Sequence, residues 1–134
     1  MTFAELKLDV VVLACAISAG IHGALVREHF EEGTGAGLGF VASTVLLAAL
    51  AVALTRNPSP FVLLATAAVF AGLIAAYTAV IATGLPVLHP EREAVEGLAL
   101  FTKAVEAVGL VLALALVPRP KGAPAWRRAP SPSR

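Results

Sequence analysis

Residues 17–32 of the chain, ISAGIHGALVREHFEE, begin as apolar sequence suited to a membrane interior and end as a charged surface. His22 and His29 lie seven residues apart within this stretch. Seven residues make about two turns of an α-helix, so the two histidines share one face and lie about 10 Å apart along the axis. The stretch therefore predicts a membrane-spanning helix with polar groups on one face, from its surface end inward.

The composition of the whole chain also indicates a membrane protein. Of its 134 residues, 58% are hydrophobic and 14% are charged, and the mean hydropathy is +0.85. A soluble domain is roughly 45–50% apolar and about 25% charged. The net charge of +1 gives no reason to expect nucleic acid as a partner. Glu5 and Asp9 stand where a signal peptide would be basic, so we expect the first apolar segment to be retained as a helix.

Four apolar stretches predict four membrane-spanning helices, over residues 8–26, 38–54, 61–83 and 98–117. Each is close to the ~20 residues that cross a ~30 Å hydrocarbon core. Their apolar residues run continuously instead of alternating, which favours helices over strands. We expect an all-α, polytopic four-helix bundle over residues 1–117. A basic, proline-rich tail over residues 118–134 has too few apolar side chains to pack, and it is expected to be disordered or associated with the membrane through Trp126 and its basic neighbours.

Basic residues predict how the bundle is oriented. With four crossings, one side of the membrane carries Lys7, Arg56, Arg119, Lys121, Arg127, Arg128 and Arg134. The other side carries only Arg27 and Arg92, together with Glu28, Glu31, Glu32, Glu91, Glu93 and Glu96. The positive-inside bias then places both termini in the cytoplasm and residues 28–36 and 84–96 outside. We expect a multi-pass protein of the plasma membrane, with the lipid bilayer as its surroundings.

Two stripes of small residues are candidates for helix contacts. Ala16, Gly20 and Ala24 in the first span, and Ala68, Gly72 and Ala76 in the third, repeat at intervals of four residues. This small-xxx-small spacing lets the backbones of neighbouring helices approach closely.

A layer of polar side chains is predicted inside the membrane. At 1.5 Å per residue, His22, Ser43, Tyr77 and Lys103 each lie about 10 Å below the outer end of their span, and Glu106 lies nearly one turn deeper. An ionised group near the bilayer centre costs at least ~2.5–3.5 kcal/mol on insertion scales, so such groups face partners or water. We therefore expect these residues to form one interhelical cluster. A purely structural role of His22, as a hydrogen-bonded packing residue, is the alternative.

The outer loops carry residues suited to a metal site. The expected ligands are His29 and His89 with Glu28, Glu32, Glu91 and Glu93, and His22 would be an inner station. Imidazole binds Zn, Cu, Fe and Ni, so the expected cofactor is a divalent transition metal. The ligand type does not distinguish among these four metals. His22 and His29 are too far apart to bind the same ion, because nitrogen ligands lie about 2 Å from the metal.

Two functions are compatible with this pattern. The chain has no phosphate-binding loop, dinucleotide fingerprint, nucleophile elbow or HExxH sequence, so an enzyme is not expected. The first function is binding or transfer of a divalent transition metal, or of protons, at an outward-facing His/Glu site. The second is an accessory subunit of a larger membrane complex, or a homo-oligomer, in which the polar layer fixes the register of the helices.

Overall fold

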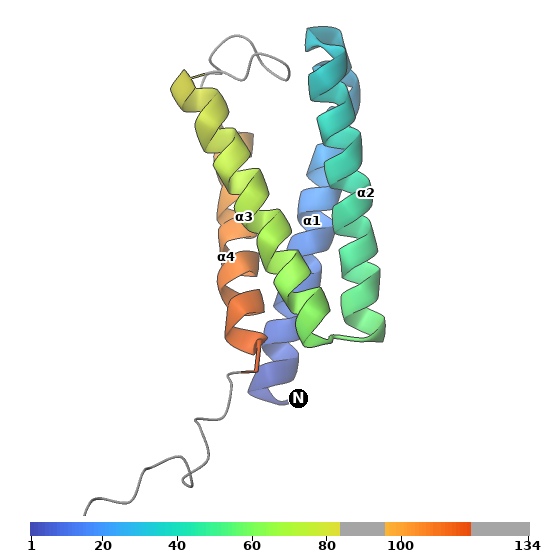
Figure 1. Ribbon diagram of the computed structural model, residues 1–134, viewed down its shortest axis with the longest axis vertical. Coiled ribbons are helices and arrows are strands. Elements are labelled where there is room, and N and C mark those ends of the chain that lie inside the picture. Colours follow the sequence, from blue (N-terminus) through green and yellow to red (C-terminus); the bar gives the residue numbers. More distant parts are fainter. Residues whose placement is uncertain (84–95, 119–134) are drawn as a thin grey trace, which may run out of the picture.

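The computed structural model describes residues 1–83 and 96–118. Within these ranges it forms four helices, α1 (Phe3–Glu32), α2 (Thr34–Arg56), α3 (Pro60–Thr83) and α4 (Gly97–Leu116) (Figure 1). All four are long and apolar enough to cross a membrane, which confirms the predicted all-helical class and the four apolar spans. The predicted tail lies outside the described residues apart from Pro118.

The first helix is longer than the hydropathy pattern predicted. It starts in a capping box, in which the Thr2 hydroxyl accepts from the Glu5 N–H at 3.2 Å and the Glu5 carboxylate accepts from the Thr2 N–H at 2.6 Å. The helix then continues through the charged residues to Glu32, and Gly33 alone separates it from α2. The break expected between the spans 8–26 and 38–54 is therefore reduced to Gly33. Hydropathy locates the end of the apolar segment, whereas charged residues such as those at the end of α1 continue a helix readily.

The other boundaries follow local signals. Ser59 precedes α3 and its hydroxyl accepts from the Val62 N–H at 3.3 Å. Pro60 occupies the first helical position, where a missing N–H breaks no helical hydrogen bond. These signals place the start of α3 within one residue of its predicted position. Helix α4 also begins and ends within one residue of its predicted span.

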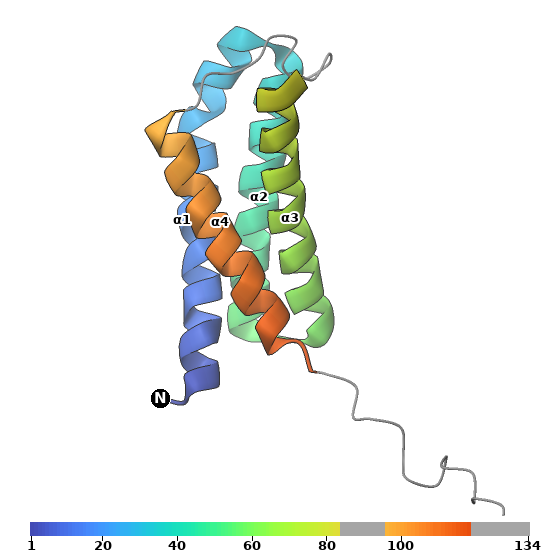
Figure 2. The same cartoon turned by 90° about the vertical axis from the view of Figure 1, so that its left-hand side faces the viewer.

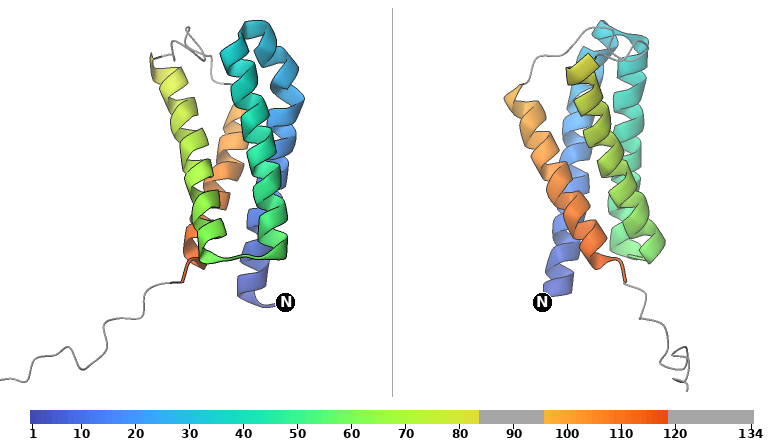
Figure 3. Two further views of the ribbon diagram at one scale, coloured as in Figure 1. Left: turned by 45° about the vertical axis from the view of Figure 1, so that its right-hand side comes forward. Right: turned by 60° about the vertical axis from the view of Figure 1, so that its left-hand side comes forward.

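The helices form two antiparallel hairpins that lie side by side. The N-terminus and the end of α4 lie at the same end of the bundle (Figure 2). Helix α1 packs against α2 and α4, and α3 packs chiefly against α4. Among the pairs of helices that touch, α2 and α3 make the least contact, and they diverge from their short connection toward the opposite end of the bundle (Figures 1 and 3).

Close helix packing occurs at a glycine that the sequence analysis did not single out. Gly109 of α4 is buried, and a Cβ atom there would lie 2.5 Å from the Phe70 ring and 3.0 Å from the Cβ of Ala14. By contrast, Gly20 and Gly72, at the centres of the two small-residue stripes, are exposed and have nothing within 4 Å of an added Cβ. The prediction that these stripes bring helices of the bundle together is wrong, because neither central glycine meets a neighbouring helix.

Apolar side chains fill the half of the bundle that contains the N-terminus. The buried members of this core are Val11, Ala14, Cys15, Ala19, Leu47, Leu50, Leu54, Leu63, Ala67, Phe70 and Ala113. Thr66 is also buried here, and its hydroxyl donates to the Val62 carbonyl of its own helix at 2.8 Å. This half of the described bundle therefore lacks buried ionisable groups other than the Cys15 thiol.

Candidate functional site: a buried carboxylate beneath an open cavity

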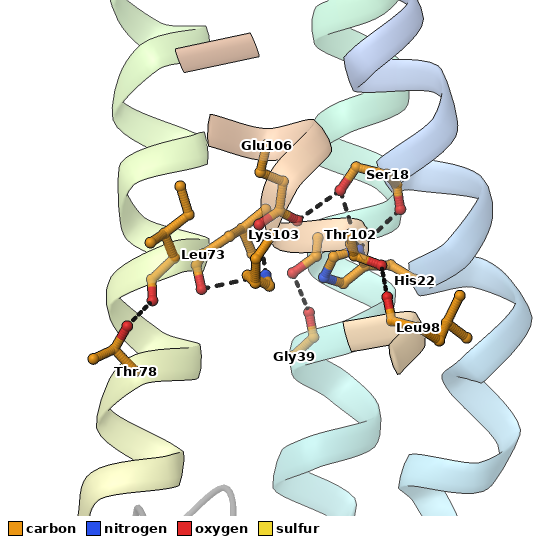
Figure 4. Close-up of polar contacts among 11 residues, drawn as sticks. Ser18, His22, Gly39, Leu73, Thr78, Leu98, Thr102, Lys103 and Glu106 are labelled. Atoms are coloured by element: carbon orange, nitrogen blue, oxygen red, sulfur yellow. Dashed lines mark hydrogen bonds and ion pairs between the residues drawn. The ribbon is translucent and has the colours of Figure 1, made fainter. Parts of the chain in front are cut away.

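Glu106 lies at the centre of the bundle and is completely buried. Both of its carboxylate oxygens accept hydrogen bonds, from the Ser18 hydroxyl at 2.7 Å and from the Lys103 ammonium at 2.5 Å (Figure 4). Lys103 and Glu106 are three residues apart on α4, a spacing at which helical side chains meet. The ion pair removes the net charge, and Ser18 ties it to α1.

Lys103 connects the same group to α3. Its ammonium lies 3.5 Å from the Leu73 carbonyl and 5.5 Å from the centre of the Tyr77 ring. The side chain is 17% exposed, whereas that of its partner Glu106 is 0% exposed. Glu106 thus lies below Lys103, within a network that joins α1, α3 and α4.

His22 extends this network on α1. Its Nδ1 atom lies 2.9 Å from the carbonyl oxygen of Ser18, which can only accept, so Nδ1 carries the hydrogen. The same nitrogen lies 3.4 Å from the Ser18 hydroxyl. Nε2 makes no hydrogen bond with a residue of the described ranges, which leaves it available to a proton or a ligand.

His29, two turns further along α1, is held in the same way. Its Nδ1 donates to the Leu25 carbonyl at 3.0 Å, and its Nε2 lies 3.9 Å from the Glu32 carboxylate. The ring of Phe40 from α2 stacks on His29, with centroids 3.5 Å apart, and also contacts His22 at 5.0 Å. One aromatic side chain therefore holds both imidazoles against the α1–α2 hairpin.

A cavity of about 340 Å³ lies between the two hairpins, above the ion pair. All four helices contribute to its wall, which includes Leu25 and Phe40 from the first hairpin and Leu73 and Val80 from the second. We call the end of the bundle that carries Glu28, Glu32 and Glu96 the open end, because these residues also line the cavity, and the end that carries the N-terminus the closed end. The cavity thus runs from an acidic mouth to a floor that includes His22 and Lys103.

The predicted polar layer maps onto this cavity. His22, Ser43, Tyr77 and Lys103 all line it, one from each helix, and Glu106 lies beneath. Ser43 itself makes no bond to the ion pair, because its hydroxyl donates to the Gly39 carbonyl of its own helix at 2.8 Å.

Two members of the site were not part of the predicted cluster. Helical spacing places Ser18 on the same face of α1 as His22, one turn deeper, but does not show that its hydroxyl points at Glu106. Phe40 gives no such signal, because an aromatic residue in an apolar helix is ordinarily a packing residue.

The predicted metal ligands are only partly brought together. Glu28, His29 and Glu32 line the mouth of the cavity, whereas His89, Glu91 and Glu93 lie outside the described residues. Within residues 1–83 and 96–118, no three His, Cys, Asp or Glu side chains lie close enough to hold a metal ion. The described part of the chain therefore does not support the predicted metal site.

Comparison of the chain with protein-family models, with curated proteins and with solved structures gave no match.

Proposed function

We propose that the protein is a multi-pass protein of the plasma membrane that takes up protons from one side of the bilayer and carries them through the cavity to Glu106. The observation that carries this proposal is the line of hydrogen bonds from His22 through Ser18 to Glu106. An intramembrane carboxylate with a polar approach from one side is the feature expected of a proton relay.

Each hydrogen-bond donor along this line points toward Glu106. A proton from the cavity binds Nε2 of His22, and the ring passes its Nδ1 proton to the Ser18 hydroxyl oxygen. The Ser18 hydroxyl in turn gives its own proton to Glu106. Each group gains one proton and loses one, which leaves the imidazole protonated at Nε2. The ring returns to its starting tautomer when Nδ1 takes up a second proton and Nε2 releases its own to the cavity. Uptake converts the neutral pair into a neutral acid beside the Lys103 ammonium.

The open end is proposed to face the outside of the cell. Lys7 lies near the start of α1 and Arg56 ends α2, both toward the closed end, and the glutamates of the mouth lie at the open end. The positive-inside bias favours the cytoplasm for the closed end. Because apolar side chains fill that half of the described bundle, the proposed path serves uptake from the outside and stops at Glu106.

Transition-metal binding is a weaker candidate on the same residues. His29 and Glu32 offer a pair of ligand atoms 3.9 Å apart at the mouth, but a third ligand would have to come from outside the described residues. An accessory role in a larger membrane complex has firmer support, since the bonds of Glu106 and Lys103 join three helices and would fix their register.

Infrared difference spectroscopy of the protein in lipid would separate these functions. A step to lower pH should produce a protonated-carboxyl band that disappears in Glu106→Gln, which identifies it as Glu106. Ser18→Ala should slow the appearance of this band. Ser43→Ala, a matched loss of a cavity hydroxyl that is not bonded to Glu106, should leave its rate unchanged.

Two outcomes would contradict the proposal. A spectrum without any band sensitive to Glu106→Gln would refute proton uptake and favour the register role. An equal rate in wild type and Ser18→Ala would refute the path through Ser18. Dialysis against Zn²⁺ followed by metal analysis, with His29→Ala as the control, tests the metal candidate separately.

A further inference from the structure

The cavity above the ion pair differs from an ordinary packing defect in both size and lining. Its volume of about 340 Å³ falls at the lower end of the range of ligand pockets, roughly 300–1,000 Å³. Its wall is largely apolar, with the aromatic rings of Phe40 and Tyr77 from opposite hairpins. A few polar groups at its two ends interrupt this surface, as in sites that fix the orientation of a small molecule.

The mouth selects for positive charge. Among the described residues that line the cavity, the acids are Glu28, Glu32 and Glu96, and the one lysine is Lys103. The charge of Lys103 is already neutralised by Glu106. A cation at the mouth would thus meet carboxylates, whereas an anion would be repelled.

The floor selects for a group that both donates and accepts a hydrogen bond. His22 is only 6% exposed and lines the cavity, and its Nε2 has no partner among the described residues. Lys103 uses two of its three N–H groups, on Glu106 and on Leu73, so a third can point into the cavity. One acceptor and one donor at the same floor match a hydroxyl group.

We propose that the cavity binds a small hydroxylated amine, with its ammonium group among the mouth glutamates and its hydroxyl at His22 and Lys103. The two ends are about two helical turns apart, or about 10 Å along the axis, which a single aromatic ring with a short aminoalkyl chain spans. This inference rests on the proposed function in one respect, since the ligand and the proton share the cavity and Nε2 of His22.

Calorimetric titration of the purified protein with four ligands of one shape tests the proposal. Tyramine carries both end groups, 2-phenylethylamine lacks the hydroxyl, tyrosol replaces the ammonium with a hydroxyl, and 4-hydroxyphenylacetate carries a negative charge. Tyramine should bind most tightly. Loss of the hydroxyl should weaken binding about tenfold, because it leaves the polar floor unpaired. The anion should not bind.

Variants locate the two ends of the ligand. Glu28→Gln should weaken tyramine binding about twofold to fivefold, as expected for an exposed charge pair at the mouth. Glu31→Gln is the matched control, because the neighbouring Glu31 pairs with Arg27 instead of lining the cavity, and it should leave binding unchanged. His22→Ala should reduce tyramine to the affinity of 2-phenylethylamine and should not affect the latter.

Equal affinity for all four ligands would indicate partition into the apolar wall or the detergent and would overturn the proposal. Equal loss in the Glu31 and Glu28 variants would overturn the orientation. The infrared test of Glu106 is independent of these titrations. Protonation of Glu106 without tyramine binding would refute only the ligand, and tyramine binding without protonation of Glu106 would refute only the proton function.

Discussion

Replacement of Glu106 by glutamine tests whether the central pair is ionised. Glutamine keeps the size of the side chain and an oxygen that can accept from Ser18, so the change removes the charge and little else. Lys103 would then be left without its carboxylate beside a completely buried site. Removal of one partner from a buried ion pair costs about 3–5 kcal/mol. Since the Lys103 side chain is 17% exposed and faces the cavity, we expect a loss near the lower end, about 3 kcal/mol.

Unfolding of the protein in mixed micelles by titration with dodecyl sulfate, followed by circular dichroism, measures this loss. Lys103→Met in the Glu106→Gln background should restore about 2 kcal/mol, because it removes the unpaired ammonium and keeps the apolar stem. Glu31→Gln breaks an ion pair of the exposed α1 surface and should cost no more than about 0.5 kcal/mol. If Glu106→Gln matched the wild type and Lys103→Met gave no recovery, the carboxyl would be protonated at rest and the proposed uptake would have no acceptor.

Three further predictions follow from the packing and the charge pattern. Gly109→Ala should destabilise the bundle by about 1–3 kcal/mol, because the new methyl group overlaps the buried Phe70 ring, whereas Gly72→Ala should be neutral within error. Equal effects of the two changes in the same unfolding assay would contradict the packing at Gly109. Phe70→Ala should cost about 3–5 kcal/mol by leaving a cavity between α3, α4 and α1, and stability equal to the wild type would show that this core is not packed as described. In a Cys15→Ala background, an impermeant reagent added to intact cells should label a cysteine at position 31 and not one at position 57; the reverse pattern would invert the proposed topology.

The sequence predicts the helices better than it predicts their contacts. Continuous apolar runs of spanning length determine where α3 and α4 lie, and proline and serine mark the start of α3. The end of α1 was misplaced because charge reports exposure and does not by itself end a helix. The small-residue stripes were misplaced because spacing identifies a face that permits close packing, but not whether that face meets its own chain or the surroundings.

The sequence predicts how deep the residues of the candidate site lie in the bundle, but not which of them are hydrogen-bonded to one another. Counting residues from the span ends places His22, Ser43, Tyr77 and Lys103 at one level, and all four line one cavity. Depth alone does not say which hydroxyl points at the carboxylate. Ser18 bonds to Glu106, whereas Ser43 bonds within its own helix, and this difference depends on how α1 and α2 are rotated about their axes.

The position of Glu106 explains why the two halves of the bundle are built so differently. Toward the closed end, Gly109 lets α4 approach Phe70 and Ala14, and apolar packing holds the helices together. Toward the open end, α2 and α3 diverge and a cavity lies between the hairpins. Glu106 lies one turn from Gly109, at the boundary between the two, where the helices are still close enough for Ser18 and Lys103 to reach it. A carboxylate nearer the closed end would have no polar residues between it and the cavity. A carboxylate nearer the mouth would be hydrated. Only at this level can one side chain be both enclosed by the packed half and reached from the cavity.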